Sequence, residues 1–166
     1  MSFNVRLARI DDAEGMTHVL NPIVEEGLYT VLDTTFTPEE EQEFICNFPE
    51  QGILTVAQHD ESLQIAGFQA VEPFANYTRV FDHVGIIGTF VDASFRRQGV
   101  AKRLFETTFE IAKTKGYEKL FAYVRSDNER ALATYLSQGF EVIGTAKKHA
   151  KVRGEYVDEV LIEKFL

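Results

Sequence analysis

The chain has 166 residues, of which 45% are hydrophobic and 26% are charged, and its formal net charge is −9. This composition is typical of a folded domain of ordinary size and excludes a largely disordered chain. The acidic balance argues against nucleic acid as the main partner, because phosphate contacts along a polynucleotide need a broad basic surface. We therefore expect a single domain over residues 1–166.

Cysteine content and apolar runs narrow the class of protein further. Nothing at the start resembles a signal peptide, and no apolar run approaches the roughly 20 residues of a membrane helix. We expect a cytoplasmic protein that does not bind membranes. The single cysteine, Cys46, excludes an internal disulfide and a Cys-based zinc cluster, and no metal is expected. No base is paired with Cys46 in the sequence, so we interpret it as a buried structural thiol.

The first half of the chain mixes strands with two helices. Thr37 and Pro38 are typical of a helix start. The acidic run that follows is interpreted as helix-start electrostatics and a solvated face, with a metal or substrate site as the alternative. Alternating apolar and polar side chains indicate strands. Strands are predicted at residues 3–8, 52–59, 63–71 and 80–91, and helices at about 12–26 and from Thr37 onward.

The second half continues with helices and strands in alternation. An apolar stripe after Val100 predicts a helix that ends near Gly116. Strands are predicted at residues 119–124, 140–144 and 156–162, and a further helix at about 128–137. The resulting order, β-α-α-β-β-β-α-β-α-β-β, predicts an α/β or α+β domain with a mixed sheet.

The stretch from Ile86 to Lys102 contains the clearest functional pattern. An apolar strand ends there, and a helix begins whose first turn is basic and contains Gly99; four of the 17 Lys and Arg residues fall between Arg96 and Arg103. The first N–H groups of a helix have no intrahelical partner, and the helix dipole favours anions there. Gly99 would let a polyanion approach the backbone. The pattern indicates a small phosphorylated ligand.

Two motifs in this region resemble a known family. Residues 96–101, RRQGVA, form an R-x-x-G-x-A pattern similar to the acyl-CoA pyrophosphate loop of the GNAT acetyltransferases. Residues 128–140 form an N-x-x-A-x-x-x-Y-x-x-x-G-F run that also resembles this superfamily. The resemblance implies one domain with a mixed, mostly antiparallel sheet of about seven strands and four flanking helices. It also implies a bulge that splays the fourth and fifth strands apart.

The resemblance implies acetyl-CoA as the acyl donor and assigns residues to it. Its pantetheine arm would pair with the backbone of Thr89, Phe90 and Val91, and Asn128 would contact the pantetheine, cap its helix, or do both. Arg96 would face the pyrophosphate or remain a surface residue that neutralises the loop. The full pyrophosphate loop would be Arg96, Arg97, Gln98, Gly99, Val100, Ala101 and Lys102.

Both ends of the chain are most similar to the phosphinothricin and methionine sulfoximine acetyltransferase branch. The similar segments are Asn21-Pro22-Ile23, residues 30–40 with their Asp33-Thr34 pair, and residues 152–158. Two positions depart from that branch, which carries a Glu where this chain has Ile86 and a His where it has Tyr135. The identity of the general base is therefore open.

The resemblance also implies direct attack by a primary amine on the thioester, without an acyl-enzyme. Tyr135 would be the general acid that protonates the departing thiolate, or else a packed helix tyrosine. Asp82, His83 and Glu72 are the candidates for the base that takes a proton from the amine, and His83 has a structural alternative at the strand end.

The loop before the fourth strand is the predicted wall of the acceptor site. Its aromatic residues Phe74, Tyr77 and Phe81 are interpreted either as substrate walls or as ordinary packing, together with Glu72 at the end of the third strand. Lys147, Lys148 and Lys151 are interpreted as a solvated strand face, with closure of the substrate or cofactor pocket as the alternative.

Three functions remain open at this stage. The favoured one is N-acetylation of a small, amino-acid-like amine by acetyl-CoA. The second is acetylation of proteins or peptides, and the third is a non-catalytic acyl-CoA-binding module. The resemblance implies a homodimer, whereas no pattern in the sequence identifies the physiological amine.

Overall fold

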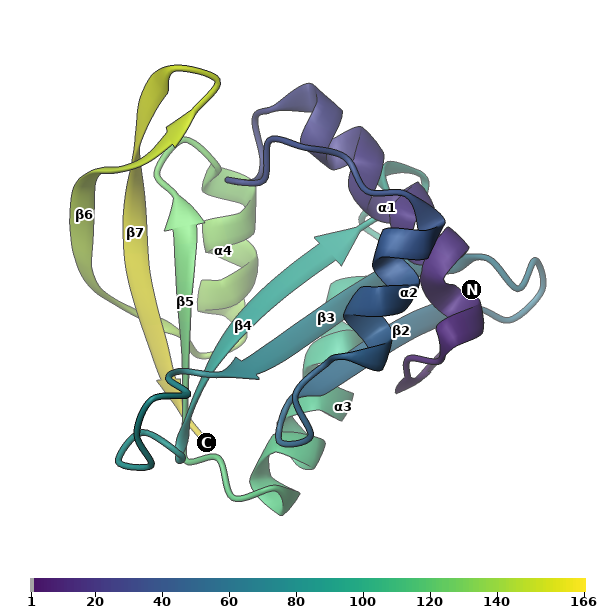
Figure 1. The fold of residues 1–166 in the computed structure, drawn as a ribbon, viewed down its shortest axis with the longest axis horizontal. Coiled ribbons are helices and arrows are strands. Elements are labelled where there is room, and N and C mark those ends of the chain that lie inside the picture. Colours follow the sequence, from purple (N-terminus) through teal and green to yellow (C-terminus); the bar gives the residue numbers. More distant parts are fainter. Residues whose placement is uncertain (1) are drawn as a thin grey trace.

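The computed structural model describes residues 2–166, and Met1 lies outside the described residues. One sheet with strand order β1-β2-β3-β4-β5-β7-β6 forms the centre of the protein (Figure 1). Its strands are β1 (Phe3–Leu7), β2 (Ile53–His59), β3 (Ile65–Pro73), β4 (Val84–Val91), β5 (Lys119–Arg125), β6 (Glu141–Val152) and β7 (Glu155–Phe165). The helices are α1 (Ala13–Glu26), α2 (Pro38–Cys46), α3 (Val100–Thr114) and α4 (Glu129–Ser137).

All neighbouring strands are antiparallel except β4 and β5. This parallel pair is short, because Val84–Ile86 pair with Lys119–Phe121 and the two strands then separate. The expected mixed sheet with a gap between its fourth and fifth strands is confirmed. The β3–β4 pairing runs from Pro73 with Gly85 to Gly67 with Val91 without a register shift. The gap therefore opens where β5 pairing ends, and the expected bulge is absent from this ladder.

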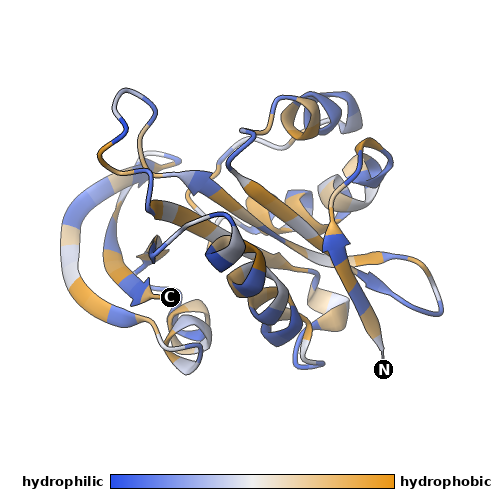
Figure 2. Cartoon of the chain, turned by 90° about the horizontal axis from the view of Figure 1, so that it is seen from below, coloured by the Kyte–Doolittle hydropathy of each residue, from blue (hydrophilic) through white to orange (hydrophobic). Residues whose placement is uncertain are grey.

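The helices cover the two faces of the sheet in pairs. The apolar stripe of α1, which includes Met16 and Leu20, packs with Phe68 of β3 on one face. Phe105 of α3, Tyr135 of α4 and Phe140 pack together on the other face. Hydrophobic residues are concentrated in the central strands, and the helices carry both hydrophobic and hydrophilic residues (Figure 2). Burial of these two cores is the main stabilising contribution to the fold.

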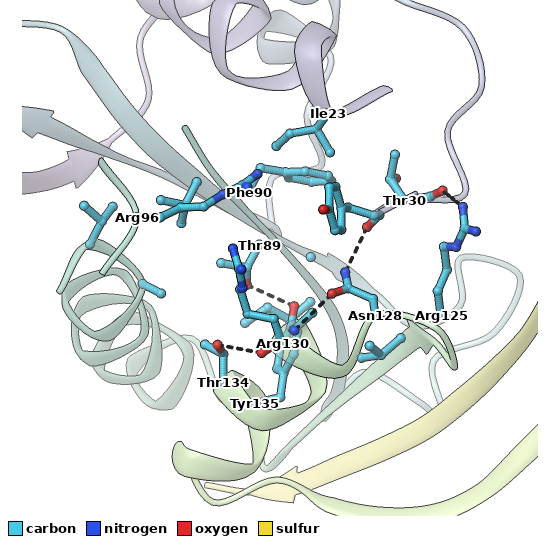
Figure 3. Close-up of a pocket in the computed structure, with 18 of the residues that line it drawn as sticks. Ile23, Thr30, Thr89, Phe90, Arg96, Arg125, Asn128, Arg130, Thr134 and Tyr135 are labelled. Atoms are coloured by element: carbon cyan, nitrogen blue, oxygen red, sulfur yellow. Dashed lines mark hydrogen bonds between the residues drawn. The ribbon is translucent and has the colours of Figure 1, made fainter. Parts of the chain in front are cut away.

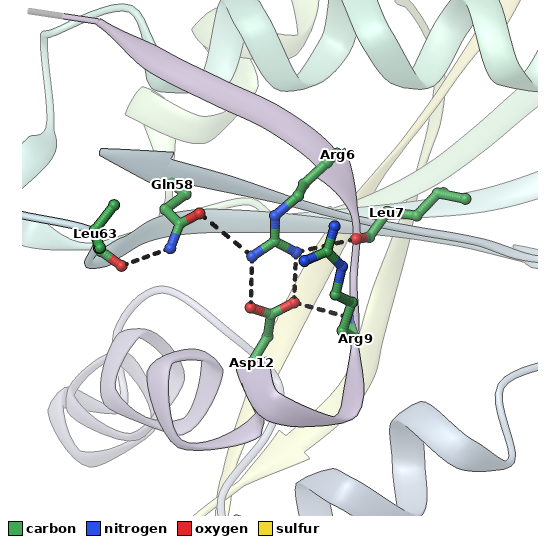
Figure 4. Close-up of polar contacts among 6 residues, drawn as sticks. All are labelled: Arg6, Leu7, Arg9, Asp12, Gln58 and Leu63. Atoms are coloured by element: carbon green, nitrogen blue, oxygen red, sulfur yellow. Dashed lines mark hydrogen bonds and ion pairs between the residues drawn. The ribbon is translucent and has the colours of Figure 1, made fainter. Parts of the chain in front are cut away.

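A buried ion pair fixes the entry to α1. Arg6 of β1 donates to both carboxylate oxygens of Asp12, at 2.8 and 2.9 Å, and the Arg9 N–H donates to the same carboxylate at 2.7 Å (Figure 4). Burial alone would raise the pKa of Asp12, but these hydrogen bonds outweigh it and lower the pKa. The carboxylate is therefore charged and fully paired at neutral pH.

Three local expectations were wrong. The strand expected from residue 80 begins at Val84, because the Val84 N–H bonds Phe81 O in a turn. Cys46 is exposed, since it lies on the outer side of the last turn of α2. The last two strands are longer than predicted, and they form a hairpin of 12 and 11 residues. None of the helices in residues 2–166 has the length and hydropathy needed to span a membrane.

Candidate functional site

A cavity of about 710 Å³ lies where β4 and β5 separate. Its walls come from β4, from the turn before α3, from the end of β5 and from the start of α4 (Figure 3). The loop after α1 closes it on the remaining side, with Tyr29 and Thr30 among the lining residues. The gap between two strands of the sheet is therefore continuous with the N-terminus of α3.

The turn that precedes α3 is shaped to receive an anion. Arg97 and Gly99 both have positive φ angles, 63° and 83°, and the first helical hydrogen bond runs from the Arg103 N–H to Gly99 O. The N–H groups of the helix's first turn, at Val100 to Lys102, precede that bond and have no acceptor within the helix. A Cβ on Gly99 would meet no atom within 4 Å, so the space beside the backbone is open. Backbone donors and the helix dipole together make this turn a phosphate site.

A buried hydrogen-bonded chain reaches the middle of the same cavity. Gln69 Nε2 donates to Thr89 Oγ1 at 2.9 Å, and Thr89 Oγ1 lies 2.9 Å from Tyr135 Oη. Either hydroxyl can be the donor in the Thr89–Tyr135 contact, and when Thr89 donates, the phenol O–H is free to donate into the cavity. Burial raises the pKa of Tyr135 to about 12, against the opposing effect of the Thr89 hydrogen bonds. Tyr135 is therefore protonated at neutral pH.

Asn128 begins α4 and also holds the loop after α1. Its Oδ1 accepts from the Ala131 N–H at 3.1 Å, and its Nδ2 donates to Tyr29 O at 3.3 Å. The capping role of Asn128 is confirmed, and its contact with a bound pantetheine stays a prediction.

Two arginines from distant parts of the chain fix the end of α1 and the loop that follows it. Arg125 Nη1 donates to Gly27 O and Thr30 O, at 2.8 and 3.0 Å. Arg153 Nη2 donates to Val24 O and Glu25 O at the end of α1. The cavity wall formed by residues 29–32 is therefore positioned by β5, α4 and the β6–β7 turn.

A second cavity of about 680 Å³ lies on the α1 and α2 side of the sheet. It shares Leu32, Ile87, Gly88 and Phe90 with the first cavity. A Cβ on Gly88 would have only the Phe90 ring within 4 Å, at 3.7 Å. The missing side chain at Gly88 therefore leaves space where the two cavities meet.

Comparison with known proteins identifies the family. The model of the acetyltransferase (GNAT) family matches residues 23–140. The chain belongs to the GNAT acetyltransferase family. A phosphinothricin N-acetyltransferase of Streptomyces coelicolor is 24% identical over 156 residues, which cover 93% of this chain and 91% of that protein. An L-amino acid N-acetyltransferase of Escherichia coli is 36% identical over 77 residues, which cover 46% of this chain and 48% of that protein.

Solved GNAT structures have the same fold. A phosphinothricin acetyltransferase from Sinorhizobium meliloti in complex with acetyl-CoA has a TM-score of 0.90 at 19% identity, covering 100% of this chain and 89% of that one. A ribosomal-protein-alanine N-acetyltransferase from Brucella melitensis has a TM-score of 0.90 at 24% identity, covering 98% and 99%. The expected family and the likeness to phosphinothricin acetyltransferases are confirmed.

The GNAT fold brings most of the predicted cofactor residues to the first cavity. Gln98 is the exception, because it does not line the cavity and its side chain donates to Ser94 O at 3.1 Å. Arg96 lies with its guanidinium 5.5 Å from the centre of the Tyr29 ring. The predicted residues that line the first cavity are Thr89, Phe90, Val91, Arg96, Arg97, Gly99, Val100, Ala101, Lys102, Asn128 and Tyr135.

The predicted base and acceptor residues are dispersed. Asp82 and His83 are exposed in the turn before β4, and Asp82 is paired with Arg79 at 3.1 Å. They line neither cavity. The first residue of β4 that lines the first cavity is Ile87, whereas the strand itself begins at Val84. Glu72 lines the second cavity.

The aromatic loop and the C-terminal lysines also lie away from both cavities. Phe74 packs on Phe81 and Phe121, and Tyr77 is 81% exposed. The packing interpretation therefore fits Phe74 and Phe81 better than a wall of the acceptor site. Lys147, Lys148 and Lys151 are exposed on β6, as predicted for a solvated strand face.

Sequence reasoning missed Glu41, which is 3% exposed and lines the second cavity. It had been assigned with its neighbours to a solvated acidic helix start. The available signal was the helical spacing, because Glu41 lies three, four and seven residues before Phe44, Ile45 and Phe48. A carboxylate on the apolar stripe of a helix faces the interior.

Proposed function

We propose that this GNAT protein transfers the acetyl group of acetyl-CoA to the primary amine of a small molecule. The observation that carries the proposal is one cavity that joins an anion-binding helix start to a buried phenol, next to a second cavity that shares four lining residues with it. The names of the phosphinothricin and L-amino acid acetyltransferase relatives favour small acceptors. An amino-acid-like acceptor, a homodimer and a cytoplasmic location stay predictions of the sequence resemblance.

The first cavity suits acetyl-CoA in both charge and shape. The N–H groups of Val100 to Lys102 would hold the pyrophosphate, with Arg96 and Arg97 beside it. The strand edge of β4 beyond Ile86 has no β5 partner, so the backbone of Thr89 to Val91 is available to the pantetheine amides. Open space beside Gly99 admits the phosphates without a clash.

The protein's own groups would then serve the transfer. Acetyl-CoA supplies a thioester whose carbonyl carbon the amine attacks, with a C–N bond formed and the C–S bond broken. Tyr135 holds a proton that it can donate to the departing sulfur, and Thr89 orients the phenol. The shared space at Gly88 and Phe90 lets the amine approach from the second cavity.

Release of free thiol from acetyl-CoA tests the proposal. The assay uses a panel of small primary amines, amino acids and N-terminal peptides, with mass spectrometry of the products. Acetylation of small amines supports the proposal. Acetylation of peptides alone would replace it with the peptide acetyltransferase alternative, and tight binding of acetyl-CoA without any transfer would replace it with the binding-module alternative.

A further inference from the structure

Glu41 is a buried carboxylate without a partner among residues 2–166. Glu41 is 3% exposed, and burial raises its pKa. No charged group or hydrogen bond of residues 2–166 offsets this effect of burial. The protein contains a contrasting case in Asp12, which is 6% exposed but receives Arg6 and the Arg9 N–H. Buried carboxylates are normally paired in this way. The Glu41 oxygens are not among the fully enclosed unpaired atoms, and Glu41 lines the second cavity, so a partner from outside residues 2–166 can reach the carboxylate there.

The cavity in front of Glu41 is acidic and otherwise apolar. Three carboxylates, Glu40, Glu41 and Glu72, line it, and no Lys, Arg or His is among its lining residues. The remaining walls are mostly hydrophobic, with Phe36, Phe44, Phe68 and Phe90 among them. Such a cavity favours a cation on an apolar body and disfavours a second carboxylate.

Glu41 is also the best placed of the acidic groups. Glu40 is used locally, because its Oε2 accepts from the Thr37 N–H at 3.1 Å in the capping box of α2. Glu72 is exposed at the end of β3. Glu159 is buried, but it lines the first cavity, where Arg125 and His149 act on its charge. Only Glu41 combines burial, lack of a partner and a place in the second cavity.

We propose that the second cavity is the acceptor site, that it selects a primary amine on an apolar body without a carboxylate, and that Glu41 pairs with the ammonium group and takes its proton. This inference rests on the proposed acetyl transfer. The ammonium passes one proton to Glu41, which releases it to solvent, and the neutral amine attacks the thioester. The C–N bond then forms and the C–S bond breaks. Tyr135 donates its proton to the departing sulfur. The nitrogen loses its second proton, and Tyr135 takes up that proton and is protonated again.

The raised pKa of Glu41 agrees with this role. A carboxylate whose burial disfavours the charged form accepts a proton more readily than an exposed one. Ile86, which also lines the cavity, contributes no titratable group. The base that the sequence left open is therefore supplied from α2 rather than from β4.

Matched acceptors test the selectivity. The panel contains L-phenylalanine, L-phenylalaninol and 2-phenylethylamine, which share one apolar body and one primary amine. The carbon that bears the amine carries a carboxylate in the first, a neutral hydroxymethyl group in the second and only hydrogen in the third. We expect kcat/KM to be about tenfold or more higher for the last two than for phenylalanine. A preference for phenylalanine would overturn the inference and leave the proposed acetyl transfer standing. No acetylation of any of the three, together with none of the wider amine panel, would instead remove the proposed function.

Variants of α2 test the carboxylate. Glu41→Gln should lower kcat/KM for phenylalaninol by about 30-fold or more, while the Kd of acetyl-CoA from calorimetry stays within about threefold and shows that the protein is folded. Glu39→Gln is the matched control, since Glu39 is exposed on the same helix and lines neither cavity. Equal activity of Glu41→Gln and Glu39→Gln would overturn the role of Glu41.

Discussion

The two cavities that meet at Gly88 differ in how they are built. The first is lined by helix N–H groups and by arginines that follow one another in the sequence, and it suits a phosphate-bearing donor. The second is lined by carboxylates from α2 and β3 and by phenylalanines from α2, β3, β4 and the loop before α2, and it has no basic residue in its lining. The difference supports the proposal that a phosphate-bearing donor occupies the first cavity and a cationic acceptor occupies the second. Changes to one cavity should therefore leave the other largely unaffected.

The largest effect is expected at the anion-binding turn. Gly99→Glu places a carboxylate beside the N–H groups that would hold the pyrophosphate, and acetyl-CoA binding should fall by about 10³-fold or more. Gly116→Glu is the matched control, because Gly116 also has a positive φ angle and open space but lies beyond the C-terminus of α3. Calorimetry measures both. Equal affinity of the two variants would show that the turn does not bind the donor.

The junction of the cavities provides the next largest effect. Gly88→Leu should fill the shared space and lower kcat/KM for amines by about 10²-fold, because the amine can no longer approach the thioester in line. Gly88→Ala should be close to wild type, since its Cβ makes only an ordinary contact with Phe90. The Kd of acetyl-CoA should change by about threefold or less in both. An active Gly88→Leu variant would mean that amines enter by another route.

Tyr135→Phe tests the chemistry inside the first cavity. Loss of the phenol proton should lower turnover by about 10²-fold with little change in acetyl-CoA affinity. Tyr117→Phe is the control, because Tyr117 is also buried but donates to Gln51 O away from both cavities. Stopped-flow or steady-state thiol release gives kcat for each. Unchanged turnover in Tyr135→Phe would assign the residue to packing alone.

The smallest effect concerns stability and pH. Burial raises the pKa of Glu41, so the folded protein binds this proton more tightly than the unfolded chain does. The free energy of unfolding therefore falls as pH rises from the ordinary pKa of glutamate to the raised pKa of Glu41 in the folded protein. Glu41→Gln should therefore be more stable than wild type at pH 7, by about 1 kcal/mol or about 2–4 °C in Tm. This gain should vanish below about pH 4, where the carboxyl is protonated in both states. Thermal melts across pH check it, and a destabilised variant at pH 7 would contradict it.

Most residues that the sequence assigned to acetyl-CoA line the first cavity, because they lie in three short segments of the chain. The turn at residues 96–102 and the run from Asn128 to Tyr135 are continuous segments that carry the two motifs of the resemblance. The role of Tyr135 came from that resemblance and not from the spacing. The gap between β4 and β5 was expected from the resemblance, and the register of the sheet shows that it begins after Ile86.

The second cavity could not be predicted from the sequence in the same way. Its residues come from four separate elements and the loop after α1, and none of them forms a local motif. Asp82 and His83 were chosen for their proximity to β4 in sequence, but the structure places them before the strand and away from the gap. The β propensity of Val80 and Phe81 was overridden by turn hydrogen bonds. Long-range packing, rather than local pattern, determines which carboxylates line the second cavity.

A crystal structure with acetyl-CoA tests the central claim most directly. The account predicts the pyrophosphate on the N–H groups of Val100 to Lys102, and the acetyl group at Gly88 and Phe90 facing the cavity that contains Glu41. An acetyl group directed away from Gly88, or a pyrophosphate bound elsewhere, would contradict it.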